Sequence, residues 1–380
     1  MTSRREKRLS SRIRVGLLFG GRSSEHTISL VTAASVLKHI DRDRFEPVPI
    51  VITKQGTWLL LDGANADFSL EQQFEVDESS DRGAAVIETA SFEVALSNRA
   101  SDTGLVLHSA AGGVDLDSID VFFPLFHGRF GEDGTVQGML ELFDRPYVGA
   151  GVLASAVGQD KHFTKTVLEH AGLTVAPWVT VSRRQWQQDA RSVRERIADL
   201  SYPLFVKPAR AGSSVGVSRV ESLAGLDAAM EVALAEDNRA LIEQGVAGRE
   251  IEVGVIGGRG GEPARASLPG EIVVEQGYYD FEAKYLGTEG VRTECPALLP
   301  QDVIERLQAT ALRAFDAIAG AGLARVDFFV TEEGDFVLNE INTMPGFTPI
   351  SMFPVVWDKS GIDYTSLISE LIDIGLEQER

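Results

Sequence analysis

The sequence predicts a multidomain α/β protein, and three observations point to this class. At roughly 150 residues per domain, 380 residues make two or three domains. Residues 15–52 have the pattern strand, helix, strand, which is the start of a parallel α/β unit. Later segments combine helices with strand pairs of the antiparallel kind. We therefore expect a disordered leader at 1–12 and domains at 13–150, 151–240 and 241–380.

The first domain is expected to be an open parallel sheet. Its apolar runs predict strands at Val15–Phe19, Phe45–Ile52 and Val121–Phe126, with helices at Thr27–His39 and Thr135–Phe143. Residues 62–115 have a weaker pattern and are expected to hold hairpins and loops. Because ligands bind at the carboxyl ends of parallel strands, residues 20–26 and 127–134 should form the ligand-facing edge.

The other two domains are expected to place helices beside antiparallel strands. The predicted helices are Asp160–His170, Leu223–Ala235 and Ser366–Leu376. The predicted strands are Leu204–Pro208, Val215–Val220, Ala240–Gln244, Glu250–Ile256, Arg325–Thr331 and Phe336–Asn342.

Composition and charge narrow the function classes. Lys and Arg number 36 against 56 for Asp and Glu, and this net charge of -20 repels phosphate backbones and anionic lipid. We therefore expect neither nucleic acid nor a membrane as partner, and any anionic substrate needs a locally basic site. The single cysteine, Cys295, excludes an intrachain disulfide, and no apolar run reaches the roughly 18 residues of a membrane span. These features indicate the cytoplasm.

The last predicted hairpin carries the strongest chemical signal. With its turn centred between residues 333 and 334, Asp327 lies opposite Glu340, and Arg325 lies opposite Asn342. Side chains alternate along a strand, so all four share one face of the sheet. Two carboxylates, an amide oxygen and an arginine suit Mg²⁺ or Mn²⁺ together with substrate phosphates. An ordinary salt bridge on a solvated face is the alternative.

A second signal is the segment Lys207-Pro-Ala-Arg-Ala-Gly-Ser-Ser-Val-Gly216, in which a strand runs into a glycine- and serine-rich loop. Glycines let backbone amides approach phosphate oxygens, and Ser213 and Ser214 add hydroxyl donors. Lys207 would supply positive charge. The segment is not a Walker motif, and taken alone it also fits a simple hairpin turn.

Three further polar segments have both a functional and a structural interpretation. His127 in segment 127–138 would contact ligand or serve as a hydrogen-bonded structural residue. Glu25 in segment 20–26 would hold an ammonium group or satisfy a helix dipole. Segment 278–285 would be a mobile lid or a surface loop. Together, the phosphate loop, lysines, metal face, arginine and lid describe phosphoryl transfer from a metal nucleotide.

From about Val15 to the C-terminus, the chain resembles the D-alanine–D-alanine ligases of the ATP-grasp superfamily. The His127–Gly138 motif is close to diagnostic for that family, whereas Glu340-x-Asn342 is shared more widely. The resemblance implies three domains, with ATP gripped between the second and third. The motifs that carry it are Gly20-Gly-Arg-Ser-Ser-Glu-His-Thr-Ile-Ser29, His127-Gly-x-x-Gly-Glu-Asp-Gly-x-x-Gln-Gly138, Lys207-Pro-x-x-x-Gly-Ser-Ser-Val-Gly216, Tyr279-Asp-x-x-Ala-Lys-Tyr285 and Asn339-Glu-Ile-Asn-Thr-x-Pro-Gly346.

The resemblance also implies residue roles at the nucleotide. Lys161 and Lys207 would hold the ATP phosphates, and Lys284 would reach the γ-phosphate. Two Mg²⁺ ions, with Mn²⁺ as a substitute, would bind Asp327, Glu340 and Asn342. Gln244 departs from members that carry lysine there, which we expect to affect nucleotide affinity rather than reaction type. The remaining nucleotide-binding positions would be Ser214, Glu243, Gln244, Val246 and Glu250, with Glu243 and Glu250 near adenine and ribose.

For the substrates, the resemblance implies that Glu25 binds the ammonium of the first D-alanine and joins Ser213 and Tyr285 in closing the lid. Arg325 would stabilise the tetrahedral intermediate, and Ser351 would hold the second carboxylate. The base for the second amine is left open between His127 and a water. A homodimer and a cytoplasmic role in making the peptidoglycan dipeptide are also implied.

Three alternatives remain. A depsipeptide ligase would use D-lactate as second substrate, but the pair Tyr285 and Ser213 favours the dipeptide reaction. Another ATP-grasp carboxylate–amine ligase conflicts with the His127–Gly138 motif. A nucleotide-binding regulator without chemistry should lack a metal ligand, a phosphate lysine or the lid pair, and the sequence carries all of them.

Overall fold

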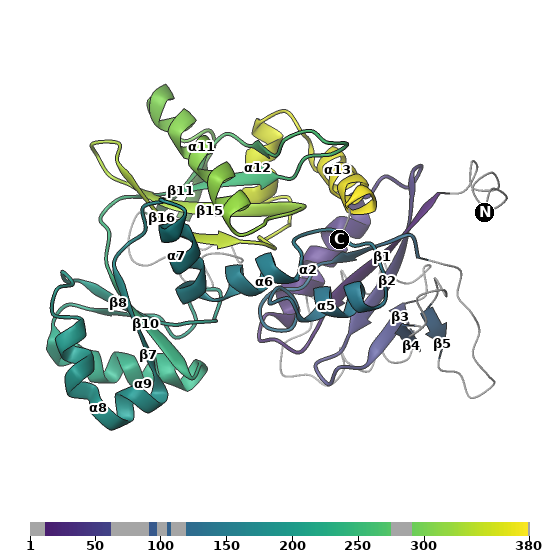
Figure 1. Ribbon diagram of the computed structural model, residues 1–380. Helices are drawn as coiled ribbons and strands as arrows, with labels where there is room; N and C mark the ends of the chain where they lie inside the picture. The colour runs from purple at the N-terminus through teal and green to yellow at the C-terminus, as the bar shows by residue number, and fades with distance from the viewer. Residues whose placement is uncertain (1–11, 62–90, 97–104, 108–118, 275–290, 379–380) are drawn as a thin grey trace.

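The computed structural model describes residues 12–61, 91–96, 105–107, 119–274 and 291–378. It contains three sheets flanked by helices, which confirms the predicted α/β class (Figure 1). Within these residues, no helix is both long enough and apolar enough to cross a bilayer. The leader that we predicted lies, apart from residue 12, outside the described residues.

The first sheet has the predicted parallel strands at one end and an antiparallel extension at the other, so as a whole it is mixed. Strand β1 pairs in parallel with β2 and β6, whereas β3, β4 and β5 extend the sheet in antiparallel fashion. Only residues 53–57 join β2 to β3, too few for the crossover that a parallel pair requires. The strand order is β5 (Leu105–Leu107), β4 (Ser91–Leu96), β3 (Trp58–Leu61), β2 (Phe45–Ile52), β1 (Ile13–Gly20) and β6 (Val121–Pro124).

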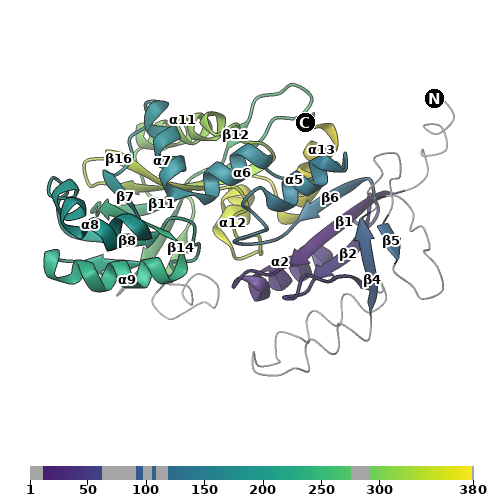
Figure 2. The same cartoon turned by 60° about the horizontal axis from the view of Figure 1, so that its bottom comes forward.

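Helices cover both faces of this sheet. Helices α2 (His26–His39) and α13 (Tyr364–Glu377) pack on one face, where Leu17 and Leu371 belong to the same buried cluster. Helix α5 (Thr135–Leu142) packs on the other face, where Leu18 and Leu140 share a second cluster. Neighbouring residues of β1 thus point to opposite faces. The C-terminal helix α13 therefore completes the N-terminal core (Figure 2).

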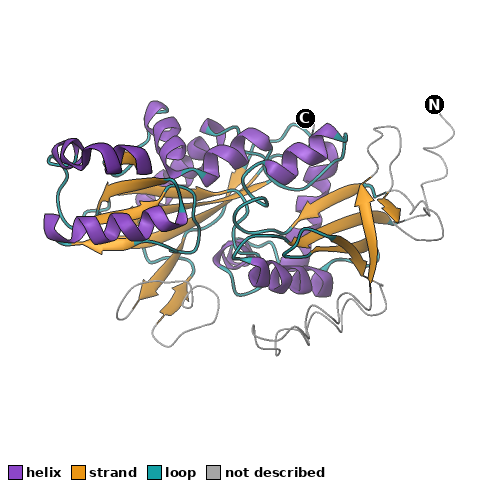
Figure 3. Cartoon of the chain, turned by 90° about the horizontal axis from the view of Figure 1, so that it is seen from below, coloured by secondary structure: helices purple, strands orange, loops and turns teal. Residues whose placement is uncertain are grey.

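The second sheet is antiparallel, and helices α8 (Arg183–Arg196) and α9 (Leu226–Glu236) pack against it (Figure 3). The predicted helix at 223–235 divides into a 3₁₀ turn, Leu223–Gly225, and α9. Strand β10 pairs along its length with β7 and β8, so the domain boundary that we predicted at 240/241 falls inside a hydrogen-bonded strand. The order is β7 (Trp178–Ser182), β10 (Arg239–Gln244), β8 (Leu204–Pro208) and β9 (Ser218–Val220).

The third sheet forms the floor of the functional region. Helices α6 (Val152–Gln159) and α7 (Lys161–His170) contact its strand β16, and their buried residues belong to the same hydrophobic cluster as this sheet. Their predicted place was in the second domain. Helices α11 (Gln301–Ala317) and α12 (Met352–Lys359) also pack on it. The order is β14 (Val291–Glu294), β13 (Gly270–Val274), β11 (Arg249–Ile256), β15 (Leu323–Val330) and β16 (Phe336–Asn342), and β12 (Arg265–Ala266) pairs with β11.

Candidate active site

A cavity of about 970 Å³ opens where elements of all three sheets meet. Its walls are the loops that follow β1 and β6, strands β8 and β10 of the second sheet, and strands β11, β15 and β16 of the third. Within the described chain, every predicted site residue except Asp327 lines this cavity. Lys284 and Tyr285 lie outside the described residues. The residues brought together are Glu25, His127, Lys161, Lys207, Ser213, Ser214, Glu243, Gln244, Val246, Glu250, Arg325, Glu340, Asn342 and Ser351.

The parallel pair β1 and β6 positions His127. Both strands end at the same edge, so Ser23 Oγ donates a hydrogen bond of 2.7 Å to the His127 carbonyl oxygen. Thr32 Oγ1 lies 3.2 Å from His127 Nε2. Burial lowers the pKa of His127 by disfavouring the imidazolium, although the charge of Glu25 opposes this effect. His127 is thus a buried neutral imidazole at pH 7, which suits a base and a structural residue equally.

The carboxylate of Glu25 joins the first sheet to the glycine- and serine-rich loop. Ser213 Oγ donates to Glu25 Oε1 over 2.5 Å. Ser213 and Ser214 have positive φ values of 50° and 59°, a region that is costly for residues with a side chain. A Cβ added at Gly128 would lie 2.4 Å from Glu25 Oε2, and one at Gly212 would lie 3.3 Å from it. The backbone therefore closes tightly around this carboxylate.

Lysines converge on the second sheet. Lys207 Nζ donates to Glu243 Oε2 over 2.5 Å, and Lys165 forms an ion pair with Glu243 Oε1. Burial alone would raise the pKa of Glu243, but the charges of Lys207 and Lys165 lower it to about 2. Burial likewise opposes the charge of Lys207, yet Glu243 raises the pKa of that ammonium. Lys161 Nζ donates to the carbonyl oxygen of Ala211 over 2.6 Å, which ties helix α7 to the loop.

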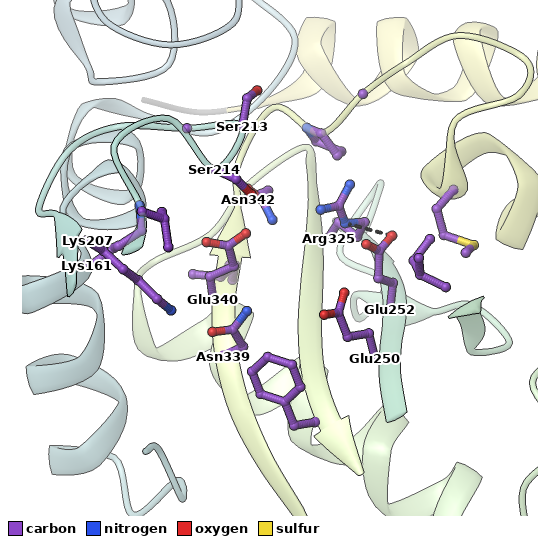
Figure 4. Close-up of a pocket in the computed structure, with 18 of the residues that line it drawn as sticks. Lys161, Lys207, Ser213, Ser214, Glu250, Glu252, Arg325, Asn339, Glu340 and Asn342 are labelled. Atoms are coloured by element: carbon purple, nitrogen blue, oxygen red, sulfur yellow. Dashed lines mark ion pairs between the residues drawn. The ribbon is translucent and has the colours of Figure 1, made fainter. Parts of the chain in front are cut away.

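The hairpin of β15 and β16 has the predicted pairing at the site. Arg325 pairs with Asn342, and Asp327 pairs with Glu340. Nearer the turn the register is different, because a bulge follows Asp327 and the pairing there is centred on residue 333. The bulge adds Asn339 to the strand, and both Asn339 and Glu340 line the cavity. Figure 4 shows these two side chains on β16, facing Lys161 and Lys207.

Arg325 is held by two carboxylates. Its Nε and Nη2 each donate to Asp327 over 2.7 Å, and Nε lies 3.1 Å from Glu252 Oε2 (Figure 4). Burial opposes its charge, but Asp327 and Glu252 raise the pKa of Arg325 well above its usual value. Asn342 Nδ2 also donates to Asp327, over 2.9 Å. Asp327 therefore orients both Arg325 and Asn342, and its metal role stays a prediction.

The donor chemistry at this hairpin fits a hard cation. Glu340 and Asn342 bring oxygen atoms to the cavity wall, as Mg²⁺ prefers. Among the described residues, no group of three or more His, Cys, Asp or Glu side chains clusters around a metal position. This sparse set suits Mg²⁺, which takes few protein ligands and completes its shell with water and substrate phosphates. The metal assignment itself stays a prediction.

Sequence reasoning missed Glu252, which lines the cavity, and Lys165, which lies next to it, and it placed Glu132 in the His127–Gly138 motif without a role. Glu252 lies two residues after Glu250 on β11, so strand alternation places both on one face. Lys165 lies one helical turn after Lys161. Glu132 accepts a hydrogen bond of 2.8 Å from the Gly128 amide. Burial and the nearby Glu25 raise the pKa of Glu132 well above its usual value.

Two predicted residues that line the cavity accept hydrogen bonds from backbone amides. Ser351 is the N-cap residue of α12, and its Oγ accepts a hydrogen bond of 3.1 Å from the Thr348 amide. Gln244 Oε1 accepts from the Ser201 amide over 2.9 Å. The roles predicted for both residues remain predictions.

Comparison with known proteins agrees with this geometry. The family model described as D-ala D-ala ligase N-terminus matches residues 14–150, and the model described as D-ala D-ala ligase C-terminus matches residues 167–373. A D-alanine–D-alanine ligase of Pseudarthrobacter chlorophenolicus is 52% identical over 373 residues, covering 96% of this chain and 94% of the relative. One from Streptomyces coelicolor is 46% identical over 380 residues, covering 96% and 93%.

Two solved structures share the fold. A D-alanine-D-alanine ligase from Coxiella burnetii superposes with a TM-score of 0.80 at 33% identity, covering 97% of this chain and 94% of the other. The VanG D-Ala:D-Ser ligase from Enterococcus faecalis has a TM-score of 0.81 at 30% identity, covering 96% and 100%. The fold is thus of the ATP-grasp type, and the chain belongs to the D-alanine–D-alanine ligase family.

Proposed function

We propose that this enzyme joins two D-alanine molecules into D-alanyl-D-alanine through a D-alanyl phosphate, with ATP converted to ADP and phosphate. The observation that carries the proposal is one cavity holding a buried carboxylate, Glu25, two lysines, Lys161 and Lys207, and a fixed guanidinium, Arg325. These groups match the ammonium, the phosphates and the developing negative charge of that reaction. The relatives that bear the name of this activity support it.

ATP would lie between the second and third sheets. Its phosphates would contact Lys161, Lys207 and Ser214, because these groups supply positive charge and donors along one wall. Adenine and ribose would lie near the end of β10 and the start of β11. The residues proposed there are Glu243, Gln244, Val246 and Glu250. Lys284 would reach the γ-phosphate.

Divalent cations would bind at the hairpin of the third sheet. Glu340, Asn342 and Asp327 would hold two Mg²⁺ ions, with Mn²⁺ as a substitute. The ions would neutralise the phosphate charge and align the γ-phosphate for in-line attack. Asp327 would exchange a contact with Arg325 for the cation, and Glu252 would then keep Arg325 in place.

In the first step, the carboxylate of the first D-alanine attacks the γ-phosphorus. A carboxyl O–P bond forms, the bond to the β-phosphate oxygen breaks, and ADP leaves. Glu25 would hold the substrate ammonium, and Arg325 would face the reacting carboxyl group. The carboxylate of Glu25 is buried at the cavity wall, where it would pair with that ammonium. The ion pair with Glu252 would keep Arg325 oriented as negative charge moves.

In the second step, the amine of the second D-alanine attacks the acyl carbon. The C–N bond forms, the C–O bond to the phosphoryl group breaks, and phosphate leaves with the electron pair and takes up the proton that the new amide nitrogen loses. The amine must first be neutral, and either His127 or a water would accept the proton. Ser351 would hold the second carboxylate. Tyr285, with Ser213 and Glu25, would close the lid and exclude the water that hydrolyses acyl phosphates.

The assembly and the location belong to the same proposal. We propose a cytoplasmic homodimer that acts on small molecules, without nucleic acid or membrane as partner, and whose product enters peptidoglycan synthesis. The domains would be divided as predicted, at 13–150, 151–240 and 241–380, except that β10 stays whole within the second and that α6 and α7 go with the third.

The test is phosphate release from ATP and Mg²⁺ with D-alanine, L-alanine, D-serine and D-lactate, each supplied alone and in pairs. We expect release that depends on D-alanine, and mass spectrometry should identify D-alanyl-D-alanine. A depsipeptide as main product would keep the site and overturn the substrate assignment. Absence of release in every combination would refute the proposed reaction.

A further inference from the structure

Lys165 lies behind the cavity wall and the proposed reaction does not use it. Its side chain is 3% exposed, and it is not among the residues that line the cavity. Its Nζ forms an ion pair with Glu243 Oε1 and lies 5.9 Å from the centre of the Trp178 ring. Trp178 is the residue paired with Glu243 across strands β7 and β10. Lys165 is therefore fixed between a carboxylate and an aromatic face.

The other oxygen of Glu243 holds a lysine that faces the cavity. Lys207 Nζ lies 2.5 Å from Glu243 Oε2, and the Lys207 side chain is 15% exposed and lines the cavity (Figure 4). Glu243 is 4% exposed and remains ionised, because its pKa is lowered to about 2. One buried carboxylate is thus shared by two lysines. Burial lowers the pKa of Lys165, whereas Glu243 favours its ammonium form, and with both lysines charged the cluster carries a net charge of +1.

This charge count depends on Lys165. Without it, Glu243 and Lys207 would form a one-to-one pair, which presents almost no net charge to an anion in the cavity. With Lys165 present, the negative charge of Glu243 is shared between two lysines. Lys207 therefore retains positive charge that attracts phosphate. The low polarity of a buried site makes that difference larger than it would be in water.

We propose that Lys165 is a positioning residue that compensates Glu243 from behind the cavity wall, so that Lys207 keeps its positive charge for the phosphates of ATP. This inference rests on the phosphate site proposed above. It assigns to Lys165 no contact with the nucleotide. Both carboxylate oxygens of Glu243 are paired with lysines, so Glu243 would meet adenosine through the backbone of β10, and adenosine binding should be insensitive to the removal of Lys165.

The test compares binding of ATP and of adenosine to Lys165→Met and to the unchanged enzyme by isothermal titration calorimetry. We expect the Kd for ATP to rise about tenfold, as the loss of one unit charge near the phosphates implies. The Kd for adenosine should stay within about twofold, and kcat at saturating ATP should change much less than KM. Lys165→Arg, which keeps the charge, should restore most of the ATP affinity. Lys165→Gln, which keeps a donor without charge, should behave like Lys165→Met and replaces it if that variant does not fold.

A matched control exists elsewhere in the molecule. Asp373 is a carboxylate 10% exposed that is shared by Arg44, at 2.8 Å, and Arg259, at 2.7 Å, outside the cavity. Arg259→Met removes one of two cations from a buried carboxylate there as well, and it should leave both Kd values unchanged. A similar loss of ATP affinity in Arg259→Met would mean that general destabilisation explains the effect, and would overturn the inference.

The variant Lys207→Met tests the proposed phosphate site separately from the role inferred for Lys165. If Lys207→Met binds ATP normally, the proposed phosphate site is wrong. If Lys207→Met weakens ATP binding and the Lys165 variants do not, the phosphate site stands and the inference fails. Equal losses of ATP and adenosine affinity in Lys165→Gln would show that Lys165 shapes the base pocket instead, which also overturns it.

Discussion

The ion pairs of Glu243 make a prediction about acid stability whose size follows from the structure. The folded state lowers the pKa of this carboxyl from 4.5 to about 2. The folded pKa lies below the unfolded one, so the stabilisation is complete at pH values well above 4.5 and is lost as pH falls toward 2. A difference of about 2.5 pKa units corresponds to roughly 3 kcal/mol of unfolding free energy at pH 7.

The perturbation is Glu243→Gln, measured by urea unfolding between pH 7 and pH 3. The variant leaves Lys165 and Lys207 without their carboxylate, so it should be less stable than the unchanged enzyme at pH 7 by about 3–5 kcal/mol. That difference should shrink by about 1 kcal/mol at pH 4 and by about 2 kcal/mol at pH 3, as Glu243 in the unchanged enzyme approaches its protonated form. Trp178, which lies beside Lys165 on the second sheet, is one of the four tryptophans whose fluorescence reports unfolding.

Glu195→Gln serves as the control, because Glu195 pairs with Arg191 on the surface of α8 and is 65% exposed. Its stability should differ from that of the unchanged enzyme by less than about 0.5 kcal/mol at every pH. A stability difference for Glu243→Gln that does not change between pH 7 and pH 3 would refute the reasoning, since Glu243 would then not be an ionised carboxylate in the fold.

Three further predictions concern other sites. Glu340→Gln should lower kcat by on the order of 100-fold while the circular dichroism spectrum stays the same, and turnover near normal in steady-state assays would remove Glu340 from the metal site. Ser213→Ala loses a 2.5 Å hydrogen bond to Glu25 worth about 1.5–3 kcal/mol, so the KM for the first D-alanine should rise at least about tenfold; an unchanged KM contradicts the role of this pair. Burial raises the pKa of Cys295 to about 11, so alkylation at pH 8 should be on the order of 100-fold slower in the native enzyme than in urea, and equal rates would contradict that pKa.

Local patterns were sufficient for the elements that build the site. Strands β8 and β16 have the predicted bounds, because each is a short run whose alternation and flanking turn residues are local. Helix α8 was not predicted, since Val193 is its only buried residue and an almost wholly polar helix has no apolar face to detect. Its capping box, Ser182 with Gln185, was the available signal.

The pairing at the hairpin of β15 and β16 was correct at the site although the turn was misplaced. The bulge after Asp327 shifts the register by one residue, which compensates for the error in the turn. A sequence pattern cannot locate such a bulge, because it depends on how two strands fit over the core. The consequence is chemical, since the extra residue brings Asn339 beside Glu340 at the cavity wall.

The sequence by itself determined the class of the protein, the edge of the first sheet and the residue types of the site, because motifs and alternation are properties of neighbouring residues. Only the tertiary structure decided how distant segments combine. It placed α13 on the N-terminal core and α7 on the third sheet, and it gave Glu252 and Lys165 their partners. Such contacts join residues far apart in the chain, and they follow from packing and charge pairing in three dimensions, which no local pattern records.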